Sequence, residues 1–82
     1  MKYFVYILQS LKDDGFYVGM TTNLEKRLNY HNKRLVKSTK HRVPFKLIYN
    51  ESFGDRKTAR DREKYLKSYK GSREKLTILE NL

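Results

Sequence analysis

The sequence contains no cysteine and no long apolar stretch, and each absence excludes a class of protein. Without cysteine the chain forms no disulfide bond and offers no thiolate ligand to a metal ion, which fits a cytoplasmic location. No segment approaches the roughly 18 apolar residues that a membrane-spanning helix needs, so we expect no membrane partner. The apolar segment after Lys2 also lacks the small-residue cleavage site of a signal peptide, and it is better interpreted as a strand.

Internal repeats, low-complexity segments and linkers are missing as well, and the chain is short at 82 residues. A chain of this length builds a single modest core, so we expect residues 1–82 to form one compact domain.

Acidic residues are absent from residues 32–49, and this stretch accounts for much of the formal net charge of +10. Its basic residues are Lys33, Arg34, Lys37, Lys40, Arg42 and Lys46. Because the phosphates of nucleic acid attract clustered lysine and arginine, we predict a nucleic-acid partner whose backbone these side chains contact. The alternative is a basic surface that only keeps the protein in solution.

Strands are predicted on both sides of a turn near the N-terminus. Bulky residues alternate over residues 2–9 with apolar side chains on both faces, which predicts a central strand covered on both sides. Residues 12–15 predict a turn in which Gly15 takes a positive φ, and the chain then returns antiparallel. Pro44 opens a third predicted strand at residues 45–49, because a proline in the first position costs no ladder hydrogen bond.

A helix is predicted next, from near Asn23 to near Leu35, and Gly19 lets the chain turn into it from the second strand. Thr22 and Glu25 stand at the spacing of a capping box, so Thr22 is the predicted N-cap. The inward stripe of this helix consists of Leu24, Leu28 and Leu35.

A second helix is predicted after Asp55, its N-cap, and Glu63 falls on the inward side of this helix. The apolar members of that side are Ala59, Leu66 and Tyr69. An isolated carboxylate there would cost several kcal/mol unless it is paired or bound to a cation. The structural alternative is an ion pair on the same helix, with Arg60, Arg62 or Lys67.

Polar side chains gather at the junction between the second strand and the first helix. Arg27 and His31 are four residues apart and therefore lie one above the other on that helix. With Tyr17 on the strand they form a candidate site held by a rigid scaffold. In the alternative interpretation, the tyrosines are sheet aromatics, Arg27 is a solvated helix charge and His31 is a satisfied core histidine.

These residues together resemble the GIY-YIG nuclease family, and in particular its small stand-alone members, which are related to the nuclease domain of bacterial nucleotide-excision repair. Phe4-Val5-Tyr6 stands in the place of the first family motif, and Tyr17-Val18-Gly19 stands in the place of the second. Arg27 follows eight residues after that glycine, and Glu63 lies on a later helix. The resemblance implies an α+β fold, a three-stranded antiparallel sheet flanked by helices, with the active site on one face of the sheet.

The resemblance also implies a role for each of five residues. Tyr6 and Tyr17 would flank the scissile phosphate, one of them as general base or as the group that aligns the attacking water. Arg27 would hold a phosphate oxygen, and His31 could share the role of the base. Glu63 would bind a single divalent cation, Mg²⁺ or Mn²⁺. The products would carry 5′-phosphate and 3′-hydroxyl ends.

The sequence departs from the family pattern at Lys75, where several relatives have asparagine, and at Met20, where the repair nucleases have lysine. The motifs together predict a metal-dependent endonuclease with DNA favoured over RNA as its substrate, and they leave open whether that DNA is structured, damaged or single-stranded. The alternatives are a non-catalytic DNA- or RNA-binding module of the same fold, and a protein-interaction domain whose basic face binds an acidic partner. The sequence leaves the oligomeric state open between a monomer and a weak dimer.

Overall fold

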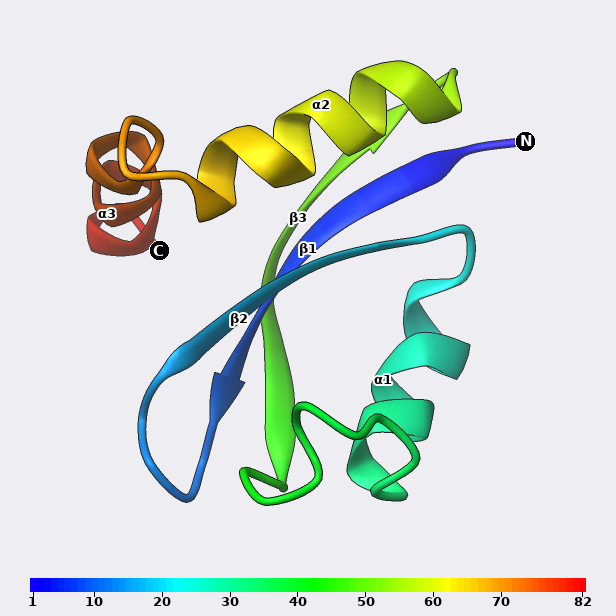
Figure 1. The fold of residues 1–82 in the computed structure, drawn as a ribbon, viewed down its shortest axis with the longest axis vertical. Helices are drawn as coiled ribbons and strands as arrows, with labels where there is room; N and C mark the ends of the chain where they lie inside the picture. The colour runs from blue at the N-terminus through cyan, green and yellow to red at the C-terminus, as the bar shows by residue number, and fades with distance from the viewer.

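The computed structural model describes residues 1–82 as three strands and three helices (Figure 1). In chain order they are β1 (Tyr3–Ser10), β2 (Phe16–Thr21), α1 (Leu24–Asn32), β3 (Phe45–Phe53), α2 (Arg56–Lys67) and α3 (Ser72–Glu80). The strands form one sheet in the order β2-β1-β3, and both pairs are antiparallel. The predicted fold class, a three-stranded antiparallel sheet flanked by helices, is confirmed. None of the three helices has the length and apolar character needed to cross a membrane.

The central strand β1 divides the core in two, because its side chains alternate between the faces of the sheet. On one face Val5 and Ile7 pack with Val18 of β2 and with Ala59 and Leu66 of α2. On the other face the buried cluster consists of Tyr6, Leu8 and Phe45, and leucines of α1 pack against it. Helix α1 therefore covers one face of the sheet, and α2 and α3 lie on the other (Figure 1).

The turn between β1 and β2 differs from the prediction in one residue. Asp14, and not Gly15, has the positive φ, at 60°. An aspartate tolerates this conformation, and here Asp13 Oδ1 accepts a hydrogen bond from the Gly15 amide at 2.8 Å. A Cβ at residue 15 would meet the Arg42 guanidinium at 2.6 Å, so a larger residue there would require this flexible side chain to shift.

Helix α1 begins one residue later than predicted and ends three residues earlier. The N-cap is Asn23, whose Oδ1 accepts a hydrogen bond from the Lys26 amide at 3.0 Å, so the prediction of Thr22 was wrong. Both residue types cap helices well, and the sequence spacing alone did not separate them. The helix ends at Asn32 and leaves Leu35 55% exposed, so only the first two leucines of the predicted stripe pack inward.

Strand β3 continues to Phe53, beyond its predicted end at residue 49, because its polar second half pairs with residues 3–6 of β1. The predicted N-cap of α2 is confirmed, as Asp55 accepts from the amides of Lys57 and Thr58. Tyr69 was expected on the buried side of this helix. It lies beyond the end of α2 and is 95% exposed, so that prediction was wrong.

Candidate active site

The two strand tyrosines lie on the face of the sheet that α1 covers. Tyr6 is opposite Gly19 in the register of β1 and β2, and its ring centroid is 6.4 Å from that of Tyr17. A Cβ at residue 19 would collide with the hydroxyl of Tyr6, so the close approach of this phenol requires glycine. Tyr6 is buried, whereas Tyr17 is partly exposed.

His31, in the last turn of α1, joins the tyrosines and is fully buried. Its Nε2 lies 3.0 Å from Tyr6 Oη, and its Nδ1 lies 2.9 Å from Thr39 Oγ1. The ring packs edge-on against Tyr17 with the centroids 5.0 Å apart. Burial, assisted by the charge of Arg27, lowers the pKa of His31 to about 4. The imidazole is therefore neutral at pH 7 and can accept a proton on one nitrogen.

Tyr6 itself is protonated at neutral pH. Burial raises the pKa of Tyr6, and the positive charge of Arg27 offsets this rise only in part. A phenol in this state donates its proton in a hydrogen bond and does not act as a ready phenolate. The contact between Tyr6 and His31 thus joins a protonated phenol to a neutral imidazole, and the phenol can donate its hydrogen bond to the ring nitrogen.

Arg27 provides the most unusual feature of the site. Its Nε is buried and has no hydrogen-bond partner, and no other side-chain nitrogen or oxygen of the protein is in this state. Its guanidinium lies 5.4 Å from the centroid of the Tyr30 ring, in the wall of an open hollow of about 240 Å³. Since an unpaired buried donor costs about 1–3 kcal/mol, the arrangement suits an anion that supplies the missing acceptor.

Glu63 reaches the same region from α2, whose buried residues pack on the other face of the sheet. Its charge contributes to the raised pKa of Tyr6, and its Oε2 is 3.0 Å from the Nζ of Lys67. That Nζ also lies 5.6 Å from the centroid of the Tyr17 ring. Glu63 therefore carries an ion pair, one of the structural partners that its position on the helix allowed, and Lys67 links it to the ring of Tyr17.

No cluster of three or more histidine, cysteine, aspartate or glutamate side chains occurs in the protein. Any metal ion at this site would depend on Glu63 alone, whose side chain is 18% exposed. A single carboxylate suits a cation that keeps most of its water ligands, as Mg²⁺ does. The donor set therefore fits a weakly held hydrated ion, and Lys67 competes with it for the carboxylate.

The basic residues of the 32–49 stretch do not all lie together. Lys33, Arg34, Lys37 and Lys40 are exposed in the loop that follows α1 and make no ion pair; we call this segment, residues 33–40, the basic loop. Arg42 is bound to Asp13, with its Nε 2.8 Å from Oδ2, and this contact lowers the pKa of Asp13 to about 2. Lys46 points to the opposite face of the sheet.

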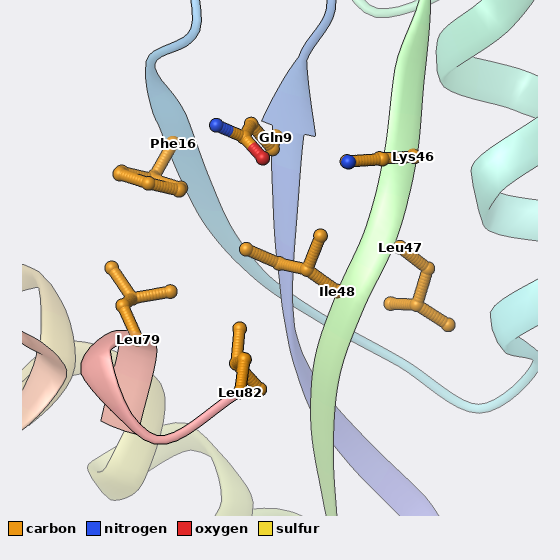
Figure 2. Close-up of a pocket in the computed structure, with 7 residues that line it drawn as sticks. All are labelled: Gln9, Phe16, Lys46, Leu47, Ile48, Leu79 and Leu82. Atoms are coloured by element: carbon orange, nitrogen blue, oxygen red, sulfur yellow. The ribbon is translucent and has the colours of Figure 1, made fainter. Parts of the chain in front are cut away.

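Lys46 lies at a large hollow, of about 510 Å³, between the sheet and α3 (Figure 2). Phe16, Ile48, Leu79 and Leu82 make most of its wall apolar. This hollow contains no carboxylate, histidine or tyrosine, so it offers no group for acid–base chemistry. Tyr6, Tyr17 and His31 are on the other side of the central strand.

One residue of this site was not predicted from the sequence. Thr39, fully buried in the basic loop, hydrogen-bonds His31. A threonine in a polar loop carries no sequence signal of burial. Lys67 was among the helix partners considered for Glu63, but its place above Tyr17 depends on how α2 packs.

Comparison with known proteins gives a family and a fold. A model of the GIY-YIG catalytic domain matches residues 2–76. The UPF0213 protein CPE1444 of Clostridium perfringens is 46% identical over 65 residues, which cover 78% of this chain and 69% of that protein. The UPF0213 protein SH2523 of Staphylococcus haemolyticus is 39% identical over 80 residues, which cover 96% of this chain and 95% of that protein. The solution NMR structure of the UPF0213 protein BH0048 from Bacillus halodurans has a TM-score of 0.56 at 32% identity and covers 96% of this chain and 85% of its own.

Proposed function

This chain belongs to the GIY-YIG catalytic domain family, and on that premise we propose that it is a metal-dependent endonuclease that hydrolyses phosphodiester bonds in DNA. One observation supports the proposal beyond the fold. The buried hydrogen bond between Tyr6 and His31 lies beside Arg27, whose Nε has no partner. Hydrolysis of a phosphate ester needs a base for the attacking water and a cation for the developing negative charge, and this arrangement offers both.

In the proposed reaction the attacking water gives a proton to Tyr6 Oη while Tyr6 gives its own proton to His31 Nε2, 3.0 Å away. The hydroxide formed in this way bonds to phosphorus, and the bond from phosphorus to the 3′ oxygen breaks. The proton held on His31 Nε2 returns through Tyr6 Oη to solvent, and the 3′ oxygen takes up one proton from solvent. The products are a 5′-phosphate and a 3′-hydroxyl, and no proton is gained or lost.

Arg27 and Glu63 complete the proposed site. Arg27 would donate from its guanidinium, which lines the open hollow, to a phosphate oxygen and so offset charge in the transition state. Nucleases of this family generally use a divalent metal ion, and Glu63 is the residue that would hold Mg²⁺ or Mn²⁺ here. Such an ion, when bound, supplies positive charge to the phosphoryl oxygens and to the departing oxygen.

The basic loop is the proposed contact to the nucleic-acid backbone. Thr39 of this loop touches His31, so its exposed basic side chains flank the reactive groups. Contacts of this kind position a phosphate without reading the bases, so we expect a preference for DNA shape rather than sequence. Branched, damaged and single-stranded DNA differ from duplex DNA in shape, and they are the substrates that we expect.

A second candidate function is a non-catalytic nucleic-acid-binding module of the same fold. The ion pair between Lys67 and Glu63 favours it, because an ammonium group on the carboxylate opposes binding of a metal ion. The module would keep the basic loop and the fold but would not cut.

A cleavage assay separates the two functions. Supercoiled plasmid and labelled duplex, nicked, flapped and single-stranded DNA are incubated with Mg²⁺, Mn²⁺ or EDTA, and an RNA hairpin is included. We expect cutting that requires metal, and a loss of roughly 10²-fold or more in Arg27→Ala and Glu63→Gln. Lys64→Ala is the matched control, because it removes an exposed charge without an ion pair from the helix that carries Glu63.

DNA cleavage and DNA binding are measured together to distinguish the two functions. Binding of DNA without metal-dependent cutting of any substrate would favour the module. Cutting by the purified protein that survives both Arg27→Ala and Glu63→Gln would overturn the proposed site.

A further inference from the structure

Thr39 is a fully buried polar residue of the basic loop, and its environment is defined by two contacts. Its Oγ1 lies 2.9 Å from His31 Nδ1 and 3.5 Å from the carbonyl oxygen of Val36. No other group of the protein is hydrogen-bonded to His31 Nδ1. The hydroxyl of Thr39 is therefore the hydrogen-bond partner of His31 Nδ1.

Two contacts favour one direction for the hydrogen bonds of His31. The hydroxyl of Thr39 is 3.5 Å from the Val36 carbonyl oxygen, and when it donates there its own oxygen can accept an N–H from His31 Nδ1. At the other end Tyr6 is protonated and its Oη is 3.0 Å from His31 Nε2, so the phenol can donate to that nitrogen. Both contacts fit an imidazole that carries its proton on Nδ1 and accepts on Nε2.

We propose that Thr39 is a positioning residue that holds His31 in the tautomer whose Nε2 accepts the proton of Tyr6. The inference rests on the proposed function, because it assigns the group that makes His31 usable as a base there. In the opposite tautomer Nε2 carries the proton and donates to Tyr6, and the phenol then has no acceptor for its own proton. A water molecule bound to that phenol could not be deprotonated through it.

The tautomer is measured directly from the ring nitrogens. In ¹⁵N-labelled protein at pH 7.5, two-bond ¹H–¹⁵N correlations distinguish a protonated from an unprotonated ring nitrogen. We expect His31 to show protonated Nδ1 and unprotonated Nε2. His41, which is exposed and has no side-chain hydrogen bond, is the internal reference for a ring that no contact holds in one tautomer.

Two variants isolate the hydroxyl group of Thr39. Thr39→Val keeps the shape and removes the hydroxyl, and Thr39→Ser keeps the hydroxyl. In Thr39→Val we expect mixed or reversed His31 nitrogen shifts and a fall in kcat of roughly ten- to a hundredfold with KM little changed. Thr39→Ser should restore the wild-type shifts and bring kcat to within about threefold. Thr77→Val, a matched substitution of an exposed threonine in α3, should change neither quantity.

A proton on Nε2 in the wild-type protein would overturn the proposal, and so would His31 shifts that are the same in Thr39→Val as in wild type. A fall in kcat that Thr39→Ser does not restore would show a purely structural role, which also contradicts it. If the wild type cuts no substrate, the proposed function fails, but the nitrogen shifts still decide the role of Thr39. Urea denaturation of each variant at the assay temperature confirms that the folded protein is being compared.

Discussion

At the scale of single residues, the strictest requirement of the site is that residue 19 has no side chain. Tyr6 Oη occupies the space that a Cβ of residue 19 would need, and the same oxygen is bonded to His31. We expect Gly19→Ala to displace the phenol, to lower the free energy of unfolding by about 1–3 kcal/mol and to reduce cleavage. Gly54→Ala is the control, since nothing lies within 4 Å of its Cβ, and it should stay within about 0.5 kcal/mol of wild type. Equal effects of the two substitutions in urea denaturation would contradict the argument.

The charge state of His31 gives a second prediction at this scale. Its pKa is about 4 in the folded protein, against about 6.5 in an unfolded chain, because burial and Arg27 oppose the imidazolium. Below pH 6.5 the unfolded chain binds a proton that the folded protein does not bind until about pH 4. The free energy of unfolding therefore decreases as the pH is lowered from about 6.5 to about 4, by at most about 1.4 kcal/mol per pH unit.

The measurement is urea denaturation at several values of pH between 4.5 and 7.5. We expect the slope between pH 6.5 and 5 to be smaller in His31→Gln and unchanged in His41→Gln, whose histidine is exposed. The ion-paired carboxylates of Asp13 and Glu51, whose pKa values are lowered, should contribute mainly below this interval. A slope that depends on His41 instead would show that the titrating group has been misassigned.

At the scale of elements, the C-terminal end of α1 explains an error of prediction and suggests a stabilising substitution. Leu35 continues the helical spacing of Leu24 and Leu28, so the sequence predicts a longer helix. The chain instead closes in a Schellman motif. The Leu35 amide donates to the Tyr30 carbonyl at 3.2 Å, and the Arg34 amide donates to the His31 carbonyl at 2.9 Å.

Arg34 occupies the position of this motif that is usually glycine, with φ at 64°. We expect Arg34→Gly to raise the free energy of unfolding by up to about 1 kcal/mol, because glycine adopts this conformation without steric cost. Lys33→Gly is the control: its φ is −84°, so glycine there brings only the entropic cost of about 0.5–1 kcal/mol. Urea denaturation of both variants tests the sign of the change in the free energy of unfolding. A lower value in Arg34→Gly would mean that the guanidinium makes a contact that stabilises the protein by more than the steric cost of the backbone conformation.

The elements that were predicted well are those whose signal is local. Alternating apolar residues identified β1, and Asp55 identified the start of α2. The second half of β3, with Asn50 and Glu51, has no apolar pattern, and it is a strand because β1 offers unpaired backbone groups beside it. Thr39 shows the same limit within the site, since its burial depends on where the basic loop meets α1 and not on its neighbours in the sequence.

At the scale of the whole molecule, the two faces of the sheet have different roles. The face under α1 holds Tyr6, Tyr17 and His31, whereas the face under α2 and α3 holds most of the buried apolar residues and the apolar hollow of Figure 2. The family resemblance gave the five candidate catalytic residues, but only the packing shows that Glu63 lies on a helix of the opposite face and is linked to Tyr17 through Lys67. The basic residues of the 32–49 stretch are likewise divided between the faces, and this lowers the salt dependence expected for DNA binding.

Six phosphate contacts, as the sequence alone suggests, would give a slope of log K against log salt of roughly −5 on duplex DNA. The structure holds Arg42 in an ion pair with Asp13 and places Lys46 at the apolar hollow, so four residues remain in the basic loop. The expected slope is therefore about −3.6. Fluorescence anisotropy of a labelled duplex in EDTA, over a series of NaCl concentrations, measures it without cleavage. The double variant Lys37→Ala/Lys40→Ala should reduce the magnitude of the slope by about 1.8, and Lys46→Ala should leave it unchanged. If Lys46→Ala reduces the slope as much as a substitution in the basic loop does, DNA also contacts the other face, and the division of charge between the faces is wrong.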